Sequence, residues 1–448
     1  MNVNIVYRPR PARRARVIAL HGSGADRSQW CTLPEALGTI TMGAVMRSRG
    51  ILVVVGATMA MALGFGGLAL TSVFMRPLEV EFGWSRADIS LAYAVATVGM
   101  AFGGVMWGRV SDRLDIRILL GIGGSGMVLP LLTMAAVQSL WQIYLAHLVF
   151  SGLGFAVLYA PLLSTTGEWF DRRRGLAIGI VTAGGALGQG VLPFLANILI
   201  DEFGWRLAFV SLAITMLVAL ALTLPFITRP AGATITSGVA AYPTSRNQEG
   251  QRLRLQILSL AGFLCCACMG VPLVHLASFV GMICGSPTIG ATSLLVAMLF
   301  GAVGRICFGL VADRIGYLPS YALASAIQTV CVAAYPLVSG NVSLLALSAL
   351  FGFGFAGNMT CLILCVREAV PAHRFGGALG MVMLAAWVGM GTGGYAGGVL
   401  FDFYASYTMS FALAGVAGLL NLSAIATMIV INHAAYRLTP GATAVAAT

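Results

Sequence analysis

The sequence predicts an all-α polytopic membrane protein with twelve transmembrane helices in two pseudo-symmetric six-helix bundles. Three observations predict this fold class. The 448 residues are 58% hydrophobic, with a mean hydropathy of +0.91, which exceeds the apolar share of soluble domains. Apolar stretches long enough to cross a bilayer recur along the chain. A short loop motif is also repeated at matching places in the two halves.

The apolar stretches leave two longer polar segments, an arginine-rich N-terminal tail and a central segment rich in Thr, Ser, Pro and Gly. The central segment is typical of a flexible linker. The tail is expected to be disordered or to be an artefact of the assigned start. The expected parts are the tail 1–48, a first bundle 49–228, the linker 229–255, a second bundle 256–432 and a cytoplasmic tail 433–448. The expected helices are 50–75, 88–108, 117–137, 140–165, 175–200, 206–228, 256–282, 288–310, 317–338, 342–366, 375–400 and 407–432.

The placement of arginines predicts the orientation, because cytoplasmic loops carry an excess of basic residues. All 26 basic residues are arginines. With a cytoplasmic N-terminus, only Arg76, Arg86 and Arg206 fall on the outer side. The linker and both termini are therefore expected on the cytoplasmic side of the inner membrane. Arg305 belongs to neither side, because it falls inside the eighth helix.

The composition also argues against several other kinds of site. Topology explains the net charge of +11, and no aromatic residues interleave the basic ones as a nucleic-acid surface would need. Cys265, Cys266 and Cys268 lie together in an apolar stretch, where a thiol behaves as a small hydrophobe. No metal, cofactor or nucleic acid is therefore expected.

One stretch of the tail, Val17 to Trp30 (VIALHGSGADRSQW), resembles the opening strand and glycine-rich loop of α/β-hydrolases. A hydrolase also needs a nucleophile elbow of the pattern G-x-S-x-G, and the sequence has none. The tail is also too short to hold a sheet and a catalytic triad. We therefore expect no enzyme.

The repeated loop motif reads G-x-x-x-D-R and follows the second and the eighth predicted helix. Glycine permits close helix approach, aspartate can accept hydrogen bonds at a helix terminus, and arginine anchors at headgroups. These properties suit a loop that gates conformational change, although two ordinary positive loops would look similar. The motif residues are Gly108, Asp112, Arg113, Gly309, Asp313 and Arg314.

This duplicated motif resembles the loop signature of the major facilitator superfamily, whose transporters have two six-helix halves. WFDRRRGLAIGIVTAGG (Trp169–Gly185) resembles the fifth-helix motif of its monocarboxylate-transporter-like and oxalate–formate-antiporter-like branch. FGWSRADIS (Phe82–Ser90) and FGWRLAF (Phe203–Phe209) resemble that branch at the entries to helices two and six. The branch's acidic–glycine–aromatic motif at the first helix is absent, since Arg49-Gly50-Ile51-Leu52 stands there.

Arg305 is the first candidate for substrate binding, because an ionised guanidinium inside a membrane helix is costly unless it has a partner or water. Its surroundings, LFGAVGRICFGLVADRIG, resemble the eighth helix of monocarboxylate transporters, and the resemblance implies a contact with a substrate carboxylate. Arginine's planar fork suits that contact. A structural arginine bonded to helix carbonyls is the alternative.

Other polar or aromatic groups in the apolar stretches are further substrate-binding candidates. His275 in the seventh helix could titrate near neutral pH or donate a hydrogen bond. Tyr159 and Asn358 lie at pseudo-equivalent places on helices four and ten, and Gln189 and Trp387 lie on helices five and eleven. Ordinary helix packing is the alternative for each.

The resemblance implies a monomeric secondary transporter that moves a small organic anion, such as a monocarboxylate, by alternating access. No acidic residue falls at mid-membrane, so either proton coupling, through His275 or the substrate's own proton, or anion exchange remains open. A transporter-like sensor that binds its ligand without turnover is the alternative function.

Overall fold

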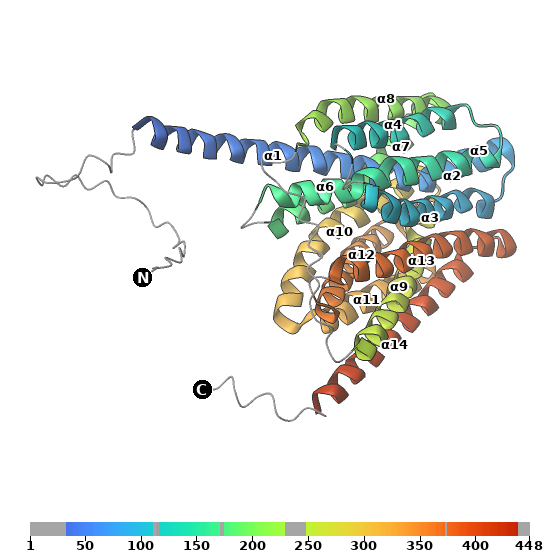
Figure 1. The fold of residues 1–448 in the computed structure, drawn as a ribbon. Coiled ribbons are helices and arrows are strands. Elements are labelled where there is room, and N and C mark those ends of the chain that lie inside the picture. The colour runs from blue at the N-terminus through green and yellow to red at the C-terminus, as the bar shows by residue number, and fades with distance from the viewer. Residues whose placement is uncertain are drawn as a thin grey trace, which may run out of the picture. The chain divides into compact units, whose positions relative to one another are not determined.

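The computed structural model describes residues 33–110, 114, 116–170, 174–228, 248–371 and 374–437. Every regular element in these ranges is helical (Figure 1). Twelve of the helical segments are long and apolar enough to cross a membrane. The expected count of twelve is therefore confirmed, and each predicted range agrees with an observed segment to within seven residues at either end.

The first half holds six of these segments, some of them built from two or three consecutive helical elements. A first unit, residues 1–48, is distinct from a second unit, residues 49–448. The elements of the first half are α1 (Leu33–Ala69), α2 (Thr71–Phe82), α3 (Arg86–Val110), α4 (Ile116–Ala135), α5 (Leu140–Leu148), η2 (Val149–Phe155), α6 (Ala156–Glu168), α7 (Arg174–Phe203), α8 (Trp205–Thr223) and η3 (Leu224–Phe226).

The second half repeats this arrangement of six segments after the linker. Its elements are α9 (Gln248–Cys284), α10 (Pro287–Ile315), α11 (Tyr317–Ala334), η4 (Tyr335–Leu337), α12 (Asn341–Ala369), α13 (Phe375–Tyr404) and α14 (Thr408–Arg437). We call the end of the bundle with the turns 83–85, 204, 285–286 and 405–407 the Arg86 end. The other end, where α10 finishes, is the Arg314 end.

The first helix begins earlier than the sequence predicts. We expected a disordered tail up to residue 48, whereas α1 starts at Leu33. Its first turns contain good helix formers such as Leu, Glu, Ala and Met, but also Gly38 and Gly43, which disfavour a helix, so local propensity alone does not account for the early start. The hydrolase-like stretch Val17–Trp30 lies outside the described residues.

The fourth membrane segment contains a π-helical stretch, η2, between α5 and α6. In a π-helix the backbone hydrogen bonds join residues i and i+5, so each turn holds more residues than in an α-helix, and Phe150 and Phe155 can face the same neighbour. Both rings fill space left by glycines of α1: a Cβ on Gly67 would overlap Phe150, and one on Gly64 would overlap Phe155. The local winding therefore fits two large rings against one glycine-rich helix face.

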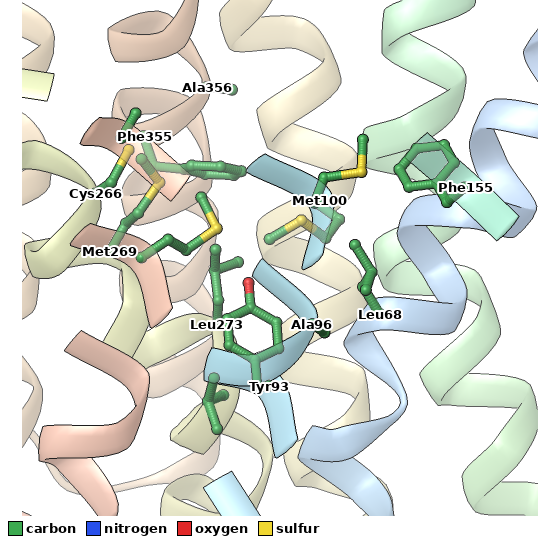
Figure 2. Close-up of a cluster of buried hydrophobic side chains, with 14 of the residues drawn as sticks. Leu68, Tyr93, Ala96, Met100, Phe155, Cys266, Met269, Leu273, Phe355 and Ala356 are labelled. Atoms are coloured by element: carbon green, nitrogen blue, oxygen red, sulfur yellow. The ribbon is translucent and has the colours of Figure 1, made fainter. Parts of the chain in front are cut away.

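The two halves meet along three helix pairs, α3 with α13, α7 with α10, and α2 with α9. Figure 2 shows side chains of both halves in one buried cluster: Met100 and Leu68 come from the first half, and Met269 and Phe355 from the second. Apolar lipid gives helices little hydrophobic reason to associate, so close packing has to supply the attraction. The interface that holds the halves together is also the one that positions the site.

Candidate functional site

Arg305 lies on α10 where this helix packs against α7 of the other half. Its Nη1 donates to the backbone carbonyl of Thr182 at 3.2 Å. Its Nε is buried and has no hydrogen-bond partner among the described residues. The guanidinium therefore ties the halves together with one donor and retains an unused buried donor, although an orphaned buried group is costly.

Aromatic side chains from three helices gather on the side of Tyr159. Tyr159 lies close enough to Arg305 for a charge on one side chain to affect the ionisation of the other. Its ring packs edge-on against Phe65 of α1 at 6.1 Å and against Phe155 at 5.8 Å. Phe65 in turn stacks on Trp387 of α13 at 6.1 Å. Arg305, Tyr159 and Trp387, which lie far apart in the sequence, are thus brought to one region between the halves.

Glycines of the fifth-helix motif create the room for Phe65. A Cβ on Gly185 would meet the ring of Phe65 at 2.5 Å, and one on Gly184 would meet Thr58 at 2.5 Å. Larger residues on α7 would therefore push α1 away. This packing gives the Ala-Gly-Gly part of the motif a physical role, which is to let α1 bring an aromatic ring to Tyr159.

Gln189 and Asn358 occupy different surroundings. Gln189 is buried on α7, next to Gly190, whose Cβ would meet Leu295 and Met298 of α10. Gly190 therefore lies at the α7–α10 interface to which Arg305 also belongs, and Gln189 is its buried neighbour on α7. Asn358 instead donates to Gln328 at 2.7 Å, and Gln328 donates to the carbonyl of Cys265 at 3.0 Å. This network lies wholly within the second half.

A second polar cluster lies at the Arg86 end and joins the two halves. Arg86 is buried and forms a salt bridge with Glu79 at 3.0 Å within the first half. Across to the second half, its Nη1 donates to the hydroxyl of Tyr407 at 2.9 Å and contacts Sδ of Met282 at 3.2 Å. Its guanidinium also lies 3.9 Å from the centre of the Phe401 ring, a cation–π contact.

The carboxylate of Asp402 makes the other connection at this end. It accepts hydrogen bonds from the backbone N–H of Arg86 at 3.0 Å and of Ala87 at 2.7 Å. These amides are the unpaired donors at the start of α3, where a negative charge is favoured. The Ser85 hydroxyl caps the same turn, because it accepts from the backbone N–H of Asp88 and donates to the Asp88 carboxylate. We call Arg86, Asp402 and Tyr407, together with His275, which contacts Tyr407, the cross-bundle lock.

The lock includes His275, one of the expected substrate contacts. Arg86 donates to the Tyr407 oxygen, so the hydroxyl proton of Tyr407 is free to point to Nδ1 of His275, 3.2 Å away. Nε2 of His275 then donates to the carbonyl of Gly394 at 2.8 Å, which defines the neutral tautomer. Burial raises the pKa of the Tyr407 hydroxyl to about 12, so this phenol is neutral at ordinary pH.

The loop-motif residues are described only in part. Asp112 and Arg113 lie outside the described residues, as does the side-chain environment of Gly108. In the second copy, Asp313 and Arg314 are exposed at the end of α10, and a Cβ on Gly309 would meet nothing within 4 Å. The hypothesis that these residues gate the transporter stays a prediction.

Several residues of these clusters were not candidates from the sequence. Phe65 had a signal that could have found it, since a single aromatic stands among glycines in GFGG. Arg86 and Asp402 gave weaker signals, because each lies at a helix end, where charged residues are ordinary. Only the fold brings these two ends together.

The sequence pattern of the Major Facilitator Superfamily matches residues 54–374, which is more than half of the chain. The chain belongs to the major facilitator superfamily. The duplicated G-x-x-x-D-R loops and the twelve membrane-spanning segments agree with this assignment. Major facilitator proteins are transporters, so the chain is a multi-pass membrane transporter.

Curated relatives confirm the resemblance to the monocarboxylate-transporter-like branch. Monocarboxylate transporter 13 of Bos taurus is 28% identical over 376 residues, covering 82% of this chain and 86% of the relative. The MFS-type transporter pynF of Aspergillus niger is 26% identical over 371 residues, covering 79% of this chain and 82% of that transporter. The relatives thus include both monocarboxylate transporters and fungal transporters of other names.

Solved structures show the same fold at lower identity. A D-xylose–proton symporter matches with a TM-score of 0.67 and 16% identity, covering 84% of this chain and 97% of the symporter. A mutant of the nucleoside transporter NupG matches with a TM-score of 0.65 and 15% identity, covering 84% of this chain and 99% of NupG. The major facilitator fold is therefore confirmed.

Proposed function

We propose that this major facilitator protein is a secondary active transporter of a small organic anion of the monocarboxylate type, with Arg305 as its anion-binding residue. The observation that carries the proposal is the state of the Arg305 guanidinium. It lies between the halves, donates to Thr182, and keeps a buried Nε without a partner among the described residues. A carboxylate bound there would satisfy that donor in a setting of low dielectric constant.

The surroundings of Arg305 suit a small anion with an apolar body. Tyr159 supplies a hydroxyl near the guanidinium, while Phe65 and Trp387 supply aromatic surface. Because Phe65 and Trp387 come from different halves, an occupant of this region would contact both. We assign the carboxylate to Arg305 and Tyr159, and the apolar part of the substrate to the two rings.

Alternating access needs an interface that can open at either end. At the Arg86 end, the cross-bundle lock joins the described residues of the first half to those of the second half. These contacts between the halves support a conformation closed at the Arg86 end. With the proposed topology, in which the linker and both termini are cytoplasmic, the conformation is inward-facing in the inner membrane.

The remaining candidate residues have supporting roles in this proposal. Gln189 is a buried polar residue of α7, the helix to which Arg305 donates, and Asn358 holds α12 to α11. His275 belongs to the lock and is separate from the anion site. Proton symport and anion exchange are both compatible with this division, because the substrate can carry its own proton.

Counterflow into proteoliposomes tests the proposal. Purified protein would be reconstituted with unlabelled formate, lactate, pyruvate or oxalate inside, and labelled anion supplied outside. We expect transient accumulation of at least one anion, abolished in Arg305→Ala. Binding of an anion without any accumulation would instead favour the sensor function. Neither binding nor accumulation of any of these carboxylates would overturn the assignment to small organic anions.

A further inference from the structure

A cavity of about 420 Å³ opens between the two halves at the Arg86 end. It is lined from α2, α3 and α7 of the first half and from α9 and α10 of the second. Its volume falls in the range of small-molecule sites. Its polar lining residues are Ser72, Arg76, Glu79, Arg86, Asn197 and Ser278. It is separate from the region of Arg305, Tyr159 and Trp387.

The charges in this cavity do not balance. Glu79 is paired with Arg86 through a salt bridge of 3.0 Å. Arg76 is exposed and makes no hydrogen bond or ion pair with any residue within the described ranges. One positive charge therefore remains uncompensated within the cavity. The other polar groups that line the cavity are neutral. Asn197 donates to the carboxylate of Asp201 at 3.1 Å, which does not itself line the cavity, and toward Thr288 across the halves, while Ser278 donates toward the carbonyl of Ser72.

We propose that this cavity is a second anion site, in which Arg76 captures the carboxylate of a substrate arriving at the Arg86 end. The inference rests on the proposed function. It assumes the same class of substrate and adds the place where that substrate first contacts the protein. A positive charge in a partly enclosed cavity raises the local concentration of anions and steers their approach. Arg305 then holds the anion only after the cross-bundle lock opens.

The site is placed so that its occupant affects the lock. Glu79 is the acidic residue lining the cavity, and its carboxylate already contacts Nε and Nη2 of Arg86. A substrate carboxylate beside Arg76 repels Glu79 and competes with it for Arg86. Arg86 is in turn the residue that reaches Tyr407 and Met282 of the second half. Arrival of an anion therefore weakens one of the contacts that hold Arg86 in the closed position.

The charge of the cavity can be measured without knowing the substrate. Val80 lines the cavity and is 77% exposed, so Val80→Cys would present a thiol there. The probes are an anionic sulfonatoethyl methanethiosulfonate and its cationic trimethylammonium counterpart, with the protein lacking Val80→Cys as blank. We expect the anionic-to-cationic rate ratio to fall on the order of threefold or more in Arg76→Gln at low ionic strength.

Two further variants test the direction in which the rate ratio changes. Glu79→Gln removes the competing negative charge, so the rate ratio should rise rather than fall. Glu202→Gln is the matched control for Glu79→Gln, because Glu202 is an exposed carboxylate at the same end that does not line the cavity. An unchanged ratio in Arg76→Gln, or a rise in Glu202→Gln equal to that in Glu79→Gln, would overturn the proposal.

Protection distinguishes a free anion from a lipid headgroup as the partner of Arg76. In phosphatidylcholine vesicles, millimolar pyruvate, lactate or formate should slow the anionic reagent in the wild type and have little effect in Arg76→Gln. No protection, together with a lower ratio when phosphatidylglycerol is added, would make Arg76 a headgroup anchor and reject the site. If protection occurs but no carboxylate is accumulated in counterflow, the anion site stands and the transport function fails.

Discussion

Asp402 at the end of α13 caps the helix that begins at Arg86, although the two residues belong to different halves of the molecule. Both carboxylate oxygens are used, one on the amide of Arg86 and one on that of Ala87. A helix N-cap normally comes from the residue just before the helix. Here a second cap comes from the opposite bundle, so the start of α3 loses hydrogen bonds when the halves separate at this end.

Asp402→Ala should therefore favour opening at the Arg86 end. Loss of a cap costs about 1 kcal/mol, or roughly a fivefold shift in the population of the open form. Spin labels at Val80→Cys and Val342→Cys, which are 77% and 82% exposed at this end, would report the separation. Glu202→Ala, which changes another exposed carboxylate of the same end, should leave the distance distribution unchanged. A distribution that Asp402→Ala does not alter would remove Asp402 from the lock.

Tyr407→Phe should weaken the lock without changing its response to pH. The variant removes the oxygen that accepts from Arg86 and reaches His275. Burial raises the pKa of this phenol from 10 to about 12. Its neutral form is therefore the stabilised one, and the contribution is lost only as pH rises through about 12. Transport by the wild type and by Tyr407→Phe should give parallel profiles between pH 6 and 9. Profiles that diverge in that window would show that Tyr407 titrates.

The fold was largely predictable because transmembrane helices are recognisable in a sequence as long apolar stretches. The twelve segments and their limits follow from that pattern, and Gly83, Gly204, Gly285, Gly316 and Gly340, which adopt positive φ in the turns, mark several of the ends. The π-helical stretch at Phe150 could not be predicted from the sequence, because it depends on which glycines of α1 the rings of Phe150 and Phe155 contact.

The candidate site was predictable only where one residue is unusual by itself. Arg305 stands out because a charge inside an apolar helix is costly. His275 was also unusual, yet its partners Tyr407 and Gly394 are distant in sequence, and they make it part of the lock. In the sequence, Arg76 looked like an ordinary charged residue at the end of a predicted helix, since nothing there indicates that a cavity forms beside it.

Close packing between α1 and α7 predicts a strong difference between two glycine-to-alanine changes. A Cβ on Gly188 would overlap the carbonyl oxygen of Ala62 on α1, whereas one on Gly104 would meet nothing within 4 Å. Gly188→Ala should lower the free energy of unfolding by about 1–3 kcal/mol through overpacking. Gly104→Ala should be neutral or slightly stabilising, because alanine favours a helix. Thermal unfolding in detergent would compare them, and equal stability would contradict the α1–α7 packing.

Arg305→Ala should abolish anion binding while leaving the protein folded. Removing one partner of a buried charged pair costs roughly 3–5 kcal/mol, or about two to three and a half powers of ten in affinity. Arg305→Lys should restore only part of this loss, because an ammonium group lacks the planar fork that binds both carboxylate oxygens.

A purely structural Arg305 leads to a different pattern of results. In that case its bond to the Thr182 carbonyl would be its main contribution, and Arg305→Ala would lower stability while any folded protein bound the anion normally. Binding of the best counterflow substrate should therefore be measured by calorimetry on protein that elutes as a single species. Arg206→Ala serves as a control for the loss of one arginine elsewhere, since that side chain pairs with Glu81 at the Arg86 end. Normal affinity in folded Arg305→Ala would exclude Arg305 from the anion site, and partial rescue by Arg305→Lys would support its direct contact with the carboxylate.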